Sequence, residues 1–165
     1  MALRNIRELG DPILLKQSKD VKELTPRLKE LIDDMWDTMH EKEGVGLAAV
    51  QVGILKRIFV VETDEEHKAV FINPVITSSE GEQTGNEGCL SVPGKVGEVT
   101  RPEKVTVDAY DIDMKPFHIE AEGFFARAIC HEYDHLDGTL YIDKVNGRLY
   151  DEEELMQDEE EEASE

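Results

Sequence analysis

The stretch FFARAICHEYDHLDG, residues 124–138, contains two histidines four positions apart, with a glutamate directly after the first: His131, Glu132 and His135. In an α-helix, residues four apart lie on one face one turn from each other, so both imidazoles can bind one metal ion. Glu132 is then placed to take a proton from water at that metal. Apolar residues upstream favour a helix over about 122–136, closed by Gly138. An exposed, charge-rich helix with incidental histidines is the alternative.

A catalytic metal site of this kind needs a third protein ligand and an open position. The pattern H-E-x-x-H-x-x-G-x-x-H is followed as far as Gly138, but Tyr141 stands where the last histidine would be. Residues 136–165 leave little room for a later ligand, because half of them form an acidic tail. We therefore expect the ligand upstream, and Cys89 in NEGCLS is the best candidate. A buried structural cysteine fits Cys89 equally well when it is taken alone.

A third cluster, GVGLAAVQVG at residues 44–53, is small and apolar except for Gln51. A glutamine amide donates hydrogen bonds without carrying charge, which suits stabilisation of an oxyanion. A tight loop and buried strand, with Gln51 hydrogen-bonded structurally, is an equally good interpretation.

The rest of the chain predicts a fold of the α+β class. Thr25 and Pro26 have the chemistry of a helix start, and apolar residues at helical spacing predict an amphipathic helix over roughly 26–42. Short strand-like runs follow at residues 57–62, 69–73, 104–110, 117–121 and 139–142. Strands gathered between two helices favour mostly antiparallel pairing.

Composition and charge limit the function classes. The 165 residues carry 38 acidic and 18 basic side chains, a net charge of −20. Residues 151–165 hold ten acids and no lysine or arginine. We therefore expect a single catalytic domain over 1–148 and an acidic, disordered tail over 149–165. A surface with this negative net charge repels nucleic acid and anionic membranes. Two cysteines and no leader-like or membrane-spanning run indicate a protein of a reducing cytoplasm.

Together, the three segments resemble the peptide deformylase family. GVGLAAVQVG at 44–53 is similar to its first motif, EGCLS at 87–91 to its second and HEYDH at 131–135 to its third. Their order and separation also fit, and the resemblance covers nearly all of residues 1–145. Two positions depart from the usual pattern: Val50 replaces a common proline, and Cys130 replaces a common glutamine. We expect Cys130 to pack in the core, about 100° around the helix from His131.

The resemblance implies a fold with the sheets packed around a central helix that carries H-E-x-x-H. It implies hydrolysis of the N-formyl group from the initiator methionine, with release of formate. Cys89, His131 and His135 would hold one divalent metal ion, preferably Fe²⁺, with Zn²⁺, Ni²⁺ or Co²⁺ as substitutes. Glu132 would act as the general base, and the Gln51 side chain and Leu90 backbone N–H would donate to the oxyanion.

The resemblance also implies a shallow apolar pocket for the methionine side chain. The residues expected to line it are Val45, Gly46, Glu87 and Ala128. Arg127 is unexpected beside them, and a pairing of Glu87 with Arg101 that fixes the Cys89 loop is an alternative to a role in the pocket.

The expected partners are formyl-methionyl peptides and nascent chains in the cytoplasm, without direct binding of nucleic acid or membranes. Docking on the ribosome through the C-terminus is not expected, because that segment is strongly negative. Two other functions stay open at this point: an H-E-x-x-H metallopeptidase that cuts internal peptide bonds, and a non-enzymatic acidic interaction module.

Overall fold

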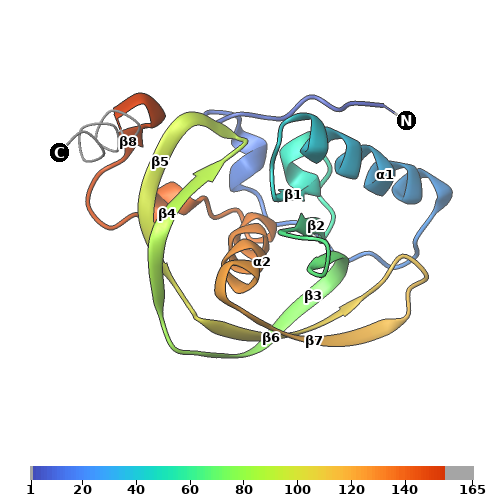
Figure 1. Cartoon of the computed structure of the whole chain (residues 1–165). Helices are drawn as coiled ribbons and strands as arrows, with labels where there is room; N and C mark the ends of the chain where they lie inside the picture. The colour runs from blue at the N-terminus through green and yellow to red at the C-terminus, as the bar shows by residue number, and fades with distance from the viewer. Residues whose placement is uncertain (1, 155–165) are drawn as a thin grey trace.

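Antiparallel strand pairs form two sheets in this protein, whose computed structural model describes residues 2–154 (Figure 1). The larger sheet has the order β1 (Gly46–Ala48), β2 (Ile58–Glu62), β3 (Lys68–Glu80), β6 (Lys104–Tyr110), β7 (Pro116–Glu122). The smaller has the order β4 (Gln83–Cys89), β5 (Val92–Arg101), β8 (Tyr150–Asp151). The helices are α1 (Pro26–Glu41) and α2 (Gly123–Leu136), with short 3₁₀ turns η1 (Pro12–Leu15), η2 (Ala49–Val52) and η3 (Tyr141–Asp143). The expected α+β class with antiparallel sheets is confirmed.

Local chemistry sets the ends of both long helices. The Thr25 hydroxyl accepts a hydrogen bond from the Leu28 backbone N–H at 3.2 Å, and Pro26 occupies the first helical position, so α1 begins where the sequence indicates. At the other end of the fold, α2 stops at Leu136 and the chain turns through Gly138, whose φ is +77°. A left-handed residue after a helix favours glycine.

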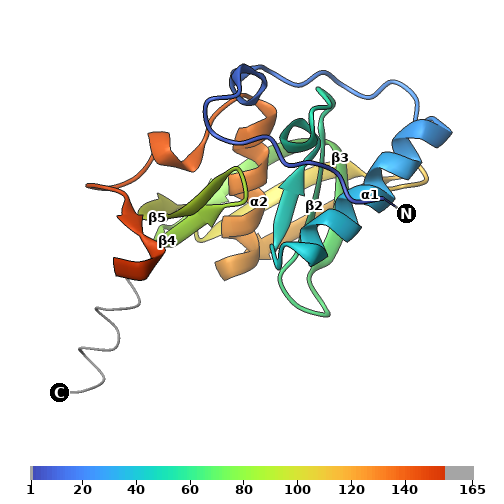
Figure 2. The same cartoon turned by 90° about the horizontal axis from the view of Figure 1, so that it is seen from above.

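Strand β2 forms the centre of the hydrophobic core. Phe59 and Val61 belong to the apolar cluster beneath α2, whereas Ile58 and Val60 belong to the cluster beneath α1. Successive side chains of a strand point to opposite faces, so the larger sheet is covered by a helix on each side. In Figures 1 and 2, α2 lies between this sheet and the β4–β5 hairpin. The histidine-bearing helix is therefore enclosed by both sheets.

The β4–β5 hairpin is absent from the sequence expectations, because its strands contain few of the apolar, alternating residues that mark a strand. Residues 83–101 are rich in glycine and polar side chains. The two strands pair from Gln83–Arg101 to Cys89–Val92, with a register shift between Glu87 and Cys89. Irregular pairing of this kind is common beside active sites, where it redirects a side chain.

The prediction of a strand at 139–142 is wrong, and the strand predicted at 69–73 is shorter than the observed β3. Residues 141–143 form η3, which buries Tyr141 and lets its hydroxyl donate to the Lys95 carbonyl at 3.2 Å. Strand β3 continues to Glu80 through a polar, largely exposed stretch that the hydrophobic pattern does not mark.

Near the expected boundary at residue 148, the chain remains attached to the smaller sheet. Tyr150 and Asp151 of β8 pair with Val96 and Lys95 of β5. The disorder predicted for the rest of the acidic tail falls on residues 155–165, which lie outside the described residues. Within residues 2–154, no helix combines the length and apolar character needed to cross a bilayer.

Gly138→Ala is expected to destabilise the fold strongly. A Cβ at this position would lie 2.5 Å from the Leu15 carbonyl oxygen, in addition to the strain of a positive φ. Gly147 is the matched control, because it has φ +83° but no atom of the described residues lies within 4 Å of its would-be Cβ. In urea unfolding, Gly147→Ala should cost about 1 kcal/mol and Gly138→Ala at least about 2 kcal/mol more. Equal losses would show that the contact with Leu15 is harmless.

Candidate active site

Three potential metal ligands meet between α2 and the hairpin tip. One ligand atom each from Cys89, His131 and His135 lies within 4.8 Å of the other two. The two histidines come from successive turns of α2, and Cys89 ends β4, where the two-residue turn Leu90–Ser91 leads into β5. The Cys89 Sγ and His135 Nε2 atoms are 3.4 Å apart. One thiolate and two imidazoles suit a borderline-soft divalent ion such as zinc or ferrous iron, so the residues present fit a metal.

The Glu87 carboxylate orients His131 from behind. His131 Nδ1 donates to Glu87 Oε1 at 2.9 Å, because an ionised carboxylate can only accept, and this leaves Nε2 free to face the cluster. Burial favours the neutral acid, but hydrogen bonds from His131 and Arg101 outweigh it and lower the pKa of Glu87 from 4.5 to about 2. Glu87 therefore stays charged and fixes the tautomer of His131.

Two buried arginines hold Glu87 in turn. Arg101 donates to it through Nε at 3.0 Å and Nη2 at 2.9 Å, and its Nη1 reaches Asp134 of α2 at 2.6 Å. Arg127 Nη1 lies 2.5 Å from Glu87 Oε2 and 3.1 Å from the Val99 carbonyl oxygen. The pairing of Glu87 with Arg101 that the sequence left as an alternative is present.

The sequence expectations give no role to Arg127 or Asp134. An arginine on the apolar face of a helix needs a buried anion or several carbonyl acceptors, and that requirement was the available signal. The guanidinium donates into β4 and β5, so it is not a free positive charge in the pocket. Asp134 carries no such signal, because exposed acids are frequent on this chain.

Glu132 lies on the same helix and packs against β1. Its carboxyl group is buried, and Oε1 has no hydrogen-bond partner within the described part of the chain. A Cβ on Gly46 would lie 2.5 Å from Glu132 Oε2, so only glycine leaves room for this carboxylate. Burial raises the pKa of Glu132 from 4.5 to about 7, which suits a group that gains and loses a proton near neutral pH.

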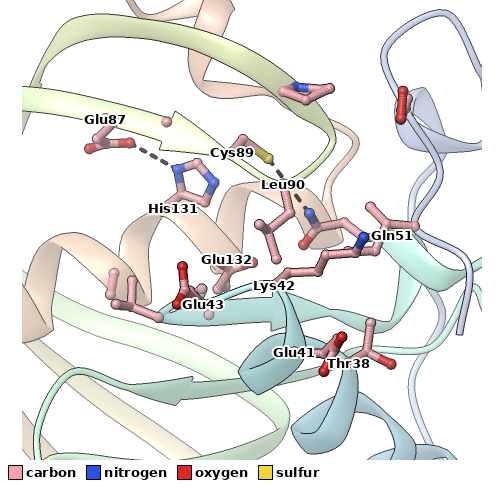
Figure 3. Close-up of a pocket in the computed structure, with 18 of the residues that line it drawn as sticks. Thr38, Glu41, Lys42, Glu43, Gln51, Glu87, Cys89, Leu90, His131 and Glu132 are labelled. Atoms are coloured by element: carbon pink, nitrogen blue, oxygen red, sulfur yellow. Dashed lines mark hydrogen bonds and ion pairs between the residues drawn. The ribbon is translucent and has the colours of Figure 1, made fainter. Parts of the chain in front are cut away.

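Gln51 belongs to η2 and faces the cluster of Cys89, His131 and His135. Its Oε1 accepts from the Ala48 backbone N–H at 2.9 Å, and its Nε2 lies 3.6 Å from Cys89 Sγ. Figure 3 shows Gln51, Cys89 and Leu90 around one pocket, with Glu132 beneath them. An amide donor, a carboxylate base and three metal-type ligands therefore converge on the same space.

A groove of about 870 Å³ opens onto this convergence. All four residues expected to bind substrate line it: Val45, Gly46, Glu87 and Ala128. Val45 is 39% exposed, whereas the other three are buried. The arrangement can support metal-assisted attack of water on a carbonyl carbon.

The second cysteine lies outside the ligand cluster. Cys130 packs in the apolar cluster beneath α2 with residues of the larger sheet, in agreement with the expectation of a packing role. Burial raises the pKa of its thiol from 9.0 to about 11, so it stays protonated at neutral pH. Val50, the other departure from the family pattern, is buried in the same cluster.

Comparison with known proteins identifies a family. The family model described as polypeptide deformylase matches residues 3–149. A peptide deformylase of Lachnoclostridium phytofermentans is 59% identical over 161 residues, covering 93% of this chain and 99% of the relative. One of Agathobacter rectalis is 58% identical over 151 residues, covering 92% and 95%.

Solved structures agree with the sequence relatives. A peptide deformylase from Legionella pneumophila superposes with a TM-score of 0.84 at 46% identity, covering 88% of this chain and 87% of that one. A peptide deformylase from Synechococcus elongatus, solved in complex with actinonin, gives a TM-score of 0.84 at 40% identity, covering 88% and 80%.

Gly46→Ala is expected to slow hydrolysis at this site by roughly 10- to 100-fold, because the added methyl group displaces the Glu132 carboxylate. Steady-state kinetics and metal content should be measured together, and metal binding should persist. Gly147→Ala is the control, since its Cβ would lie within 4 Å of no atom of the described residues 2–154. An unchanged rate in Gly46→Ala would mean that the position of Glu132 does not matter.

Proposed function

The chain belongs to the polypeptide deformylase family, and we propose how its residues remove the N-formyl group from the N-terminal methionine of nascent polypeptides. The reaction adds water across a formamide bond and releases formate and a free amine. The observation that supports this most directly is the convergence of Glu132, Gln51 and the Cys89 cluster on one groove. A peptidase for internal bonds gives no role to Gln51 or Cys89, and an interaction module gives none to Glu132.

Cys89, His131 and His135 are the proposed ligands of a divalent metal ion. When bound there, the ion supplies a Lewis acid that lowers the pKa of water and polarises the formyl carbonyl. Glu87 keeps the His131 ring in the orientation that such a ligand needs.

Glu132 is the proposed general base and, later, the general acid. Its carboxylate accepts a proton from the attacking water, whose oxygen bonds to the formyl carbon. As the carbon–nitrogen bond breaks, Glu132 passes the proton to the leaving nitrogen, so protons balance over the cycle. Its burial and its Oε1, which has no hydrogen-bond partner within the described residues, support this role, because that oxygen is open to a proton from water.

Gln51 and Leu90 are the proposed donors to the oxygen that becomes negative during the attack. The Gln51 Nε2 group faces the cluster, and the backbone N–H of Leu90 directly follows Cys89. Preorganised neutral donors in a water-poor site stabilise developing charge without favouring an anion in the ground state.

Val45, Gly46, Glu87 and Ala128 are the proposed walls for the methionine side chain. Glu87 contributes through its aliphatic stem, because its carboxylate is fully engaged by His131, Arg101 and Arg127. A formyl carbon carries only hydrogen, so a confined site beside Glu132 admits it and excludes larger acyl groups.

The main test uses formyl-Met-Ala-Ser, with formate and new amines both measured. Cys89→Ala should lose its metal and its activity, whereas Cys130→Ala, the other cysteine, should keep both. Glu132→Gln should retain metal but lose roughly 10²- to 10⁴-fold in kcat, because only the proton acceptor is removed. Internal cleavage without formate release, or full activity in Cys89→Ala, would contradict the assignment.

Ferrous iron is the proposed working ion, with Zn²⁺, Ni²⁺ or Co²⁺ able to replace it. The family resemblance supports iron, and a ligand set of one sulfur and two nitrogens can accept all four ions. Protein purified without oxygen should contain iron and should turn over faster per metal than the zinc-loaded form. An iron-reconstituted enzyme no faster than the zinc form would overturn this choice.

Formylated nascent chains are the proposed partners, met in the cytoplasm without docking on nucleic acid or the ribosome through the C-terminus. The net charge of −20 supports this proposal, because phosphate backbones repel it. Removal of residues 152–165 should therefore leave ribosome binding unchanged and weak at physiological salt. Tight binding by the full chain that truncation abolishes would show the reverse.

A further inference from the structure

Ser91 is a buried hydroxyl beside the site to which the mechanism so far gives no role. It is 0% exposed and occupies the second position of the turn that follows Cys89. Its Oγ lies 3.1 Å from Nε2 of Gln51, which is itself 1% exposed. Two buried polar side chains from different motifs are therefore in direct contact.

The orientation of the Gln51 amide follows from its neighbours. The Ala48 backbone N–H can only donate, so the atom 2.9 Å away must be the amide oxygen, and the nitrogen must face the hairpin. One N–H then points to Ser91 Oγ. The other lies towards Cys89 Sγ at 3.6 Å, and sulfur is a weak acceptor. This second N–H is the one available to a substrate oxygen.

We propose that Ser91 is a positioning residue that holds the Gln51 amide so that its second N–H faces the reacting carbonyl. This inference rests on the proposed function, in which Gln51 stabilises the oxyanion. With Ala48 holding the oxygen and Ser91 holding one N–H, the amide has no freedom to turn its donor away. A donor fixed in advance needs no reorganisation as charge develops, which is the source of its catalytic effect.

The backbone supports the same arrangement from outside. The Arg7 N–H donates to the Gln51 carbonyl and the Leu9 N–H to the Ser91 carbonyl, both at 2.7 Å. One N-terminal segment thus fastens both residues through their main chains, so their side chains meet at a fixed separation. Loss of the Ser91 hydroxyl would leave this frame in place and release only the amide.

A double-mutant cycle tests the proposal in the full-length, metal-loaded enzyme. Ser91→Ala should lower kcat for formyl-Met-Ala-Ser roughly tenfold with little change in KM, a fraction of the loss on removing an oxyanion donor. In a Gln51→Ala background the same change should have no further effect, because the amide it positions is gone. Ser18→Ala is the matched control: Ser18 is also buried, and its hydroxyl has no partner within residues 2–154.

A second measurement does not depend on activity. The side-chain NH₂ protons of Gln51 should exchange slowly with solvent in the parent protein and in Ser18→Ala, and at least tenfold faster in Ser91→Ala at unchanged metal content. Equal loss of kcat in both backgrounds, unchanged kcat in Ser91→Ala, or unchanged exchange would overturn the positioning role. Absence of formate release by the parent enzyme would overturn the proposed function instead, and the exchange result would still decide the Ser91–Gln51 contact.

Discussion

The site depends on the ion pairs and hydrogen bonds around the Glu87 carboxylate. This carboxylate is buried between the hairpin and α2, where an isolated charge would be very costly. Arg101 and Arg127 neutralise it from two sides, and His131 donates to it from the helix. Removing one partner of such a cluster leaves an uncompensated buried charge, so the hairpin and helix are fixed relative to each other as a unit. The distance from Cys89 to the two histidines follows from that constraint.

This arrangement explains how an irregular hairpin can hold Cys89, the proposed metal ligand, in a fixed position. The strands of β4 and β5 contain few large apolar residues, and packing alone would hold them weakly. Arg127 instead bonds to main-chain carbonyls of Gly85 and Val99 while pairing with Glu87. Polar contacts have directional requirements that apolar packing lacks, so they set position as well as attachment. Cys89 lies two residues beyond Glu87 on the same strand, so these contacts also fix where Cys89 lies.

The sequence predicts the helices well and singles out Cys89, His131 and His135, which the structure brings together, but it predicts the other contacts between segments poorly. The spacing of His131 and His135 is a property of one helix, and the start of α1 at Thr25 and Pro26 is local chemistry. The β4–β5 hairpin has no such local signal, since its pairing depends on buried ion pairs with α2. The contact of Gly46 with Glu132 joins residues far apart in the chain, so no periodicity reveals it. In the sequence Ser91 likewise resembles an ordinary turn residue, and only the structure shows its contact with the Gln51 amide.

The site also sets a limit on the stability of the fold. Glu132 is buried with one carboxylate oxygen that has no partner among residues 2–154, and Gly46 is held in a strand where a residue with a side chain would stabilise the backbone. Both features oppose folding, and together they leave space and a proton-accepting carboxylate where the proposed reaction needs them. The larger sheet compensates, because β2 is buried on both faces and carries the main core. Apolar residues of α2 that face the larger sheet therefore provide folding free energy, and part of it is used to hold Glu132 beside β1 and the two histidines beside the hairpin in fixed positions.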